Sequence, residues 1–215
     1  MISKYDIEKI NEENAFMKTY MIKRISDDID WTKISAVQID TQLQAEIVDI
    51  SATGQLCYDD NTLYVRLTAK EKNIRAEYTE LLDAPCEDSC LEFFFCPIYN
   101  DDRYFNIEYN PNCCVYLGIA SCIDDLVRLI PEAGNPFSPK ATRTTDGWEI
   151  TYQISFDFIR RFFPDFSSAS GTKMRGNFYK CGDLTVQEHY LCWNQITCNP
   201  VSFHRPCDFG ILEFE

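Results

Sequence analysis

Residues 88–110 read DSCLEFFFCPIYNDDRYFNIEYN, and this stretch decides the fold that the sequence predicts. From 88 to 97, and again from 103 to 110, the side chains alternate between two faces with the period of two that is typical of β-strands. The apolar face of the two runs consists of Leu91, Phe93, Phe95, Phe105, Ile107 and Tyr109. The segment 98–102 between them has the length of a hairpin loop. We therefore predict two neighbouring antiparallel strands that bury one face.

Short runs of the same kind recur at 62–68, 148–155, 175–181, 190–196 and 209–214. One segment has helical spacing, because Ser155 can cap it, apolar residues recur from Phe156 to Phe163, and Pro164 ends it. Many short strands with one short helix predict an all-β fold, an antiparallel β-sandwich of the jelly-roll kind. The predicted inter-sheet core contains Leu91, Phe93, Phe95, Phe105, Ile107, Trp148, Ile150 and Tyr152.

The chain of 215 residues fits one large domain. The composition from residue 1 to about 30 is charged and shows no clean helical stripe. We therefore divide the chain into an N-terminal extension, 1–29, packed on a β-sandwich domain, 30–215.

Acidic residues number 34 against 20 basic ones, which gives a net charge of −14. Nucleic acids and anionic membranes require a basic face, so we expect neither as a partner. The start of the chain lacks the apolar core of a secretory signal. The cysteine count of 11 is odd, and Cys113 and Cys114 are adjacent, which favours free thiols. Both observations predict a cytoplasmic protein, or a secreted one if a leader has been removed.

The predicted hairpin carries a polar face opposite its apolar one. If the two strands pair, Glu92 lies opposite or diagonal to Glu108, with Asn106 beside them. Facing carboxylates are destabilising unless a cation, a basic side chain or a hydroxyl-rich ligand offsets them. Arg66 and Lys180 lie on strands that could supply the positive charge. The face is thus either a binding surface or the ordinary solvated side of an antiparallel sheet.

Four pieces of the sequence resemble motifs of the family-9 carbohydrate-binding modules, in the order of that family. The pieces are 62–65 (TLYV), 88–94 (DSCLEFF), 177–180 (NFYK) followed by Trp193, and 206–212 (PCDFGIL). The resemblance extends over roughly residues 30 to 215. It implies a β-sandwich that binds carbohydrate without catalysis, with a possible link to carbohydrate catabolism, and a mono- or oligosaccharide as partner.

In that family a sugar lies between two aromatic side chains. The resemblance places Cys86 and Phe203 at these two positions, so one wall is absent and the other is smaller than tryptophan. Glu92 matches a family glutamate that contacts sugar hydroxyls, and Trp193 is a further candidate for an aromatic platform. The predicted ligand-binding residues are Glu92, Asn106, Glu108, Arg66, Lys180, Trp193 and Phe203.

Other functions remain open at this point. Glu92 and Glu108 could serve a carboxylate-based glycoside hydrolase, and the same face could bind a protein. Cys86, Cys90 and Cys96 share parity, but the close C-x2-C pairs that typify zinc sites do not occur among them. Acidic pairs at 59–60, 101–102 and 124–125 could bind calcium or simply form turns. We predict no cofactor and no catalytic residue, and we leave the metal content and the oligomeric state undetermined.

Overall fold

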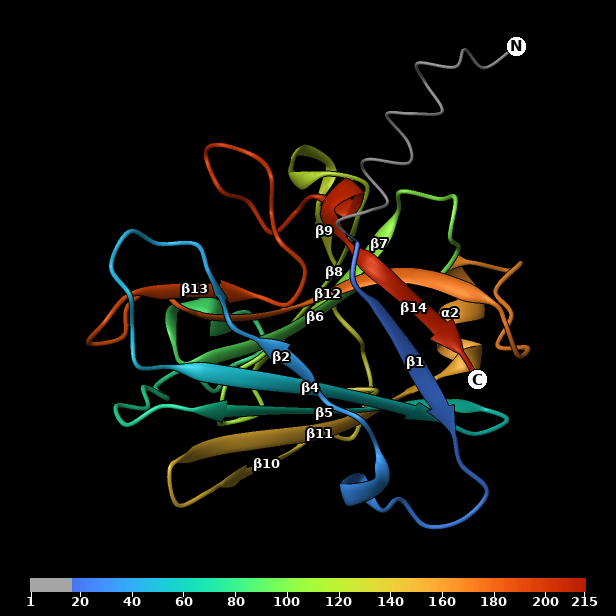
Figure 1. Cartoon of the computed structure of the whole chain (residues 1–215), viewed down its shortest axis with the longest axis horizontal. Helices are drawn as coiled ribbons and strands as arrows, with labels where there is room; N and C mark the ends of the chain where they lie inside the picture. Colours follow the sequence, from blue (N-terminus) through green and yellow to red (C-terminus); the bar gives the residue numbers. More distant parts are fainter. Residues whose placement is uncertain (1–16) are drawn as a thin grey trace.

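The computed structural model describes residues 17–215. Its strands form two layers that a single strand joins (Figure 1). The first layer contains β10 (Lys140–Arg143), β11 (Gly147–Ser155), β5 (Thr62–Lys70), β4 (Ser51–Tyr58) and β2 (Val37–Ile39). The second layer contains β14 (Gly210–Phe214), β12 (Lys173–Gly182), β6 (Cys90–Cys96), β7 (Tyr104–Tyr109), β8 (Val115–Ala120) and β9 (Val127–Arg128), with β13 (His189–Cys192) and β3 (Thr41–Gln42) beside β12.

The joining strand is β1 (Thr19–Arg24), which pairs in parallel with β14 on one side and with β4 on the other. All other strand pairs in the described residues are antiparallel. The predicted all-β antiparallel sandwich with one short helix is therefore confirmed, with β1 as the parallel exception. Of the extension assigned to 1–29, residues 19–24 contribute this strand, whereas residues 1–16 lie outside the described part.

The β6–β7 hairpin pairs as predicted, and of the two alternatives left open, opposite or diagonal, Glu92 lies directly opposite Glu108. Every predicted core residue is buried, and Tyr152 is the most exposed of them at 3%. Phe93 stacks on both Phe95 and Phe178, with ring centroids 4.9 and 4.8 Å apart. This aromatic packing between the layers explains the high aromatic content, because each buried ring removes a large apolar area from water.

The helix is α2 (Phe156–Phe162), and its ends follow the sequence signals. The Ser155 hydroxyl accepts a hydrogen bond from the backbone N–H of Phe158, which satisfies a free donor of the first turn. Phe156 and Ile159 are buried against the sandwich. Four short 3-10 helices lie in the loops of the described chain: η1 (Trp31–Lys33), η2 (Pro85–Glu87), η3 (Ile123–Asp125) and η4 (Pro206–Asp208).

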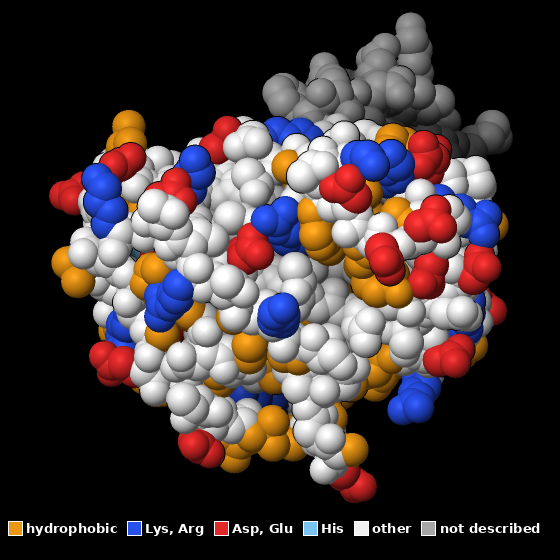
Figure 2. Space-filling view, turned by 90° about the horizontal axis from the view of Figure 1, so that it is seen from below, with side chains coloured by type: hydrophobic (Ala, Val, Ile, Leu, Met, Phe, Trp, Pro, Cys, Tyr) orange, Lys and Arg blue, Asp and Glu red, His pale blue; other side chains and the backbone are white. Residues whose placement is uncertain are grey.

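The surface carries charges of both signs. Figure 2 shows Lys and Arg side chains interspersed with Asp and Glu over the face seen from below. In residues 17–215, no helix has the length and apolar character needed to cross a bilayer.

Candidate functional site

The face of β6, β7 and β12 that points away from the inter-sheet core is called here the outer face. It has two parts. One part is apolar, and loop residues that include Phe203 pack on its buried cluster of Phe94, Tyr104 and Tyr179. The other part carries the side chains of Cys90, Glu92, Asn106, Glu108 and Cys181. These two parts adjoin because Tyr179 is the register partner of Glu92.

Glu92 and Glu108 are both buried, with exposed fractions of 2% and 7%. They are direct cross-strand partners. Burial raises the pKa of both carboxyl groups, and the charge of Glu108 raises the pKa of Glu92 further. Two carboxylates in this position favour a proton, a cation or several hydrogen-bond donors between them.

Asn106 supplies polar atoms that no other described residue satisfies. Its side chain is 0% exposed, and neither its amide nitrogen nor its amide oxygen has a hydrogen-bond partner of good geometry in residues 17–215, although the amide lies close enough to Glu108 to lower the pKa of that carboxyl group. The Oε2 atom of Glu108 is unpaired in the same way. Buried polar groups are nearly always hydrogen-bonded, so these atoms indicate a position for water or a polar ligand.

Aromatic rings flank these polar atoms. Phe203 stacks on Tyr179 with centroids 4.1 Å apart, and Tyr190 meets the edge of Phe203 at 6.2 Å. Tyr116, the register partner of Glu108, lies on the other side, with the guanidinium of Arg128 above its ring at 4.5 Å. The outer face therefore combines carboxylates and an amide with partly exposed rings.

Trp193 does not lie on this face. It is 3% exposed and packs edge-to-face on the core residue Phe178, with centroids 5.7 Å apart. Cys192 is the register partner of Tyr179, so the residue after it turns to the opposite side of the sheet. Trp193 is therefore not an exposed platform, because its side chain points to the core side of the sheet.

Arg66 and Lys180 do not reach the carboxylates either. Arg66 belongs to β5 in the other layer and forms an ion pair with Glu149. Lys180 is opposite Leu91, so it points to the core side, where its Nζ lies 2.7 Å from His189 Nε2 and 3.3 Å from Glu71 Oε1. Arg128 on β9 is the basic residue beside Glu108, and its charge opposes the rise in the pKa of that carboxyl group.

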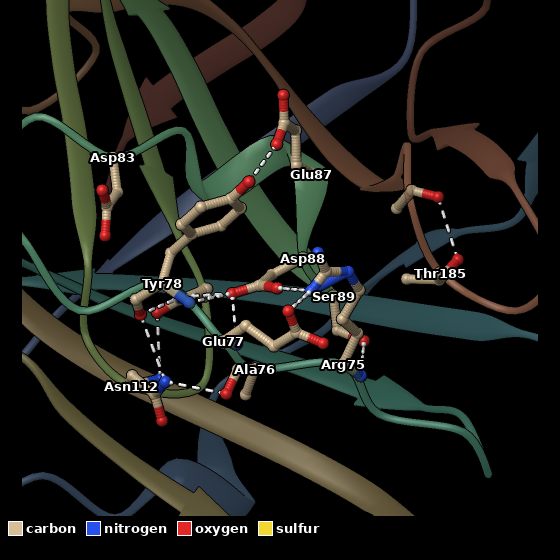
Figure 3. Close-up of polar contacts among 12 residues, drawn as sticks. Arg75, Ala76, Glu77, Tyr78, Asp83, Glu87, Asp88, Ser89, Asn112 and Thr185 are labelled. Carbon is tan, nitrogen blue, oxygen red and sulfur yellow. Dashed lines mark hydrogen bonds and ion pairs between the residues drawn. The ribbon is translucent and has the colours of Figure 1, made fainter.

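A buried aspartate fixes the loop that leads into β6 (Figure 3). The carboxylate of Asp88 accepts hydrogen bonds from the backbone N–H groups of Glu77 and Tyr78, each at 2.9 Å, and pairs with Arg75 at 3.1 Å. This network anchors η2, which positions Cys86 at the edge of the outer face. The backbone carbonyl of Cys86 lies 3.7 Å from the thiol of Cys181.

Sequence reasoning missed the contribution of Cys90 and Cys181. These residues are direct register partners on β6 and β12, and the Cys181 thiol donates to Glu92 Oε1 at 2.9 Å. All 11 cysteines are free thiols in this structure, six of them buried. Local alternation showed that Cys90 and Glu92 share a face, but only strand pairing could bring Cys181 to them.

One residue of each acidic pair acts within its own turn. Asp59 accepts from the N–H of Asn61 at 2.8 Å, and Asp125 accepts from the N–H of Ser121 at 2.8 Å. Asp101 pairs with Arg103 two residues away. In two pairs the second residue forms an ion pair outside the turn, Asp60 with Arg24 and Asp102 with Arg175. The pairs therefore serve turns and ion pairs in this structure.

The fold defines a class, the β-sandwich modules, and the outer face of one sheet carries the polar and aromatic groups described above. The sequence model described as carbohydrate-binding family 9 matches residues 24–214. The chain therefore belongs to carbohydrate-binding family 9, as the sequence motifs indicated. A search of curated proteins gives no significant match.

Solved structures share the fold. A Bacteroides uniformis protein, provisionally described as carbohydrate-binding, is 24% identical with a TM-score of 0.80, covering 93% of this chain and 100% of its own. A family-9 module of Caldicellulosiruptor kristjanssonii in complex with glucose is 16% identical with a TM-score of 0.64, covering 92% of this chain and 96% of its own. The cellotriose complex of a family-9 module from that organism is 16% identical with a TM-score of 0.66, covering 92% and 94%.

Proposed function

We propose that this protein binds a mono- or oligosaccharide, without catalysis, on the polar part of the outer face. The observation that carries this proposal is the buried amide of Asn106, whose two polar atoms are unpaired among the described residues, beside the unpaired Oε2 of Glu108. Sugar hydroxyls both donate and accept, so one hydroxyl pair can serve the amide and a carboxylate together. Membership of carbohydrate-binding family 9 and the glucose and cellotriose complexes of the relatives support the proposal.

Each residue of the site has a distinct role in this proposal. Glu92 and Glu108 accept hydrogen bonds from sugar hydroxyls, and Asn106 pairs with a hydroxyl between them. Phe203 and Tyr116 present apolar ring faces to the C–H groups of the sugar. Arg128 lies on Tyr116 and holds the adjoining loop through the carbonyls of Leu81 and Asp83, at 2.7 and 2.9 Å.

The aromatic wall at residue 86 is a cysteine here, so the sugar has one strong stacking surface rather than two. We expect a dissociation constant of about 0.1 to 1 mM, which corresponds to roughly 4 to 5.5 kcal/mol. A site of this strength suits a binding module that acts by local enrichment of its ligand.

The test is a titration monitored by NMR, in a buffer that contains EDTA. Glucose, cellobiose and cellotriose, together with other mono- and oligosaccharides, are added to wild type, Asn106→Ala, Glu108→Gln and Glu149→Gln. We expect one sugar class to shift signals of β6, β7 and Phe203, with binding lost in the first two variants. Glu149→Gln, which removes a carboxylate from the opposite layer, should bind normally. Absence of any shift at several millimolar sugar, or full binding by Asn106→Ala, would refute the proposal.

A further inference from the structure

Two thiols and a carboxylate meet at the polar part of the outer face. Cys90 and Cys181 lie directly opposite each other on the central strands β6 and β12, and Glu92 follows Cys90 by two residues on the same side. One ligand atom from each of the three residues lies within 4.8 Å of the other two. All three side chains are buried, with exposed fractions of 0% for Cys90 and 2% for both Cys181 and Glu92.

We propose that Cys90, Cys181 and Glu92 bind a zinc ion. Thiolate sulfur and carboxylate oxygen are both zinc ligands. In a tetrahedral site with the usual bond lengths, two sulfur ligands lie about 3.8 Å apart, and sulfur and oxygen ligands about 3.6 Å apart. In this structure the three ligand atoms lie within 4.8 Å of one another, and Cys181 Sγ lies 2.9 Å from Glu92 Oε1, where the thiol donates a hydrogen bond. Zinc would replace that thiol proton and set the two atoms at the wider spacing of a tetrahedral site.

Glu108 gives a reason for a positive charge near Glu92. It is the cross-strand partner of Glu92 on the side away from Cys181, and it is 7% exposed. Its Oε2 atom has no hydrogen-bond partner in the described chain. Glu108 is not among the groups whose ligand atoms lie within 4.8 Å of one another, so a water molecule would complete a tetrahedral zinc site. A divalent cation would also offset the repulsion between Glu92 and Glu108.

The ligand types select the metal. Calcium and magnesium prefer oxygen ligands, so two thiols among four ligands disfavour both. A mixed set of two sulfur and two oxygen atoms on rigid strands suits a small, four-coordinate, borderline-soft ion, which is zinc. This inference goes beyond carbohydrate binding and does not depend on it.

The experiment uses the full chain, reduced and stripped of metal, without sugar. Zinc affinity is measured by competition with a chromophoric chelator for wild type, Cys90→Ser, Cys181→Ser and Cys96→Ser. Cys96 is the matched control, because it lies on the same strand and the same side as Cys90 and is also 0% exposed. We expect one zinc per chain for wild type and Cys96→Ser, and at least 100-fold weaker binding for the other two variants. No bound zinc, or equal binding by all four proteins, overturns the proposal.

Two measurements on wild type keep the test decisive if a variant fails to fold. Cobalt(II) in place of zinc should give an intense sulfur-to-cobalt charge-transfer band, and a cobalt complex without that band overturns the proposal. In a urea concentration at which the metal-free protein is alkylated at Cys90 and Cys181, zinc should protect these two thiols but not the exposed Cys122 and Cys207, as mapped by mass spectrometry. Equal alkylation with and without zinc under these conditions overturns the proposal as well. Since these measurements contain no sugar, their failure leaves carbohydrate binding to be decided by its own titration.

Discussion

The ring of Phe203 lies flat on the ring of Tyr179, with centroids 4.1 Å apart and an angle of 6° between the planes. Tyr179 is 0% exposed and donates its hydroxyl to the backbone carbonyl of Phe203 at 3.1 Å. One face of the Phe203 ring is thus fixed to the sheet, while the residue as a whole stays partly exposed. The loop that carries Phe203 is held in place where the polar and apolar parts of the outer face meet.

This arrangement predicts the effect of ring size at residue 203. Phe203→Ala should weaken sugar binding about 5- to 10-fold, since a stacking contact contributes roughly 1 kcal/mol. Phe203→Trp should strengthen binding, because the larger ring offers more apolar area to a sugar. NMR titration with the best sugar of the panel measures both changes. If the affinities of wild type and both variants coincide, Phe203 is no part of the ligand site.

The core between the layers predicts a large loss of stability at Phe93. This ring is 0% exposed and stacks on two other rings, so Phe93→Ala should lower the free energy of unfolding by about 3–5 kcal/mol. Leu82 is 67% exposed, and Leu82→Ala should change the free energy of unfolding by less than about 0.5 kcal/mol. Urea unfolding of the two variants decides the matter. Similar midpoints for both would contradict the assigned core.

The buried pair of Lys180 and Glu71 predicts a strongly coupled double mutant. Their exposed side-chain fractions are 0% and 2%, and Glu71 also accepts from Trp148 Nε1 at 2.6 Å. Lys180→Met leaves an unpaired buried carboxylate and should cost about 3–5 kcal/mol. Lys180→Met combined with Glu71→Gln should recover part of that loss, because the second change removes the unpaired charge. Additive losses in denaturant unfolding would show that the two side chains do not interact.

The environment of His204 predicts a dependence of stability on pH. Burial lowers the pKa of His204 to about 4, whereas the pKa of a histidine in an unfolded chain is about 6.5. Between these two values the unfolded chain binds the extra proton, so the free energy of unfolding falls as the pH drops from about 6.5 to 4. After allowance for partial exposure, the contribution of this group is about 2 kcal/mol.

The chain has only two histidines, so NMR can follow the His204 ring directly through a pH titration. His204→Phe, which keeps a ring beside Phe94, serves as the control and should lose this part of the pH dependence. A titration midpoint of about 6.5 for the His204 ring would contradict the prediction.

Much of this fold could be predicted from local sequence, and the reason is geometric. Side chains on a strand alternate with a period of two, so the runs at 88–97 and 103–110 predicted the core face and placed Glu92 opposite or diagonal to Glu108. Ser155 and Pro164 likewise delimit α2 through short-range effects on the backbone. Local pattern therefore sufficed wherever neighbours in sequence are neighbours in space.

The assembly of the site was decided only by tertiary structure. Lys180 and Trp193 each follow a residue of the outer face by one position, so their side chains point to the core side. Arg66 lies in the other layer. Cys181 meets Cys90 and Glu92 through pairing of strands that are distant along the chain. Such non-local pairing depends on the packing of whole sheets, and alternation within a single strand carries no information about which distant strand lies beside it.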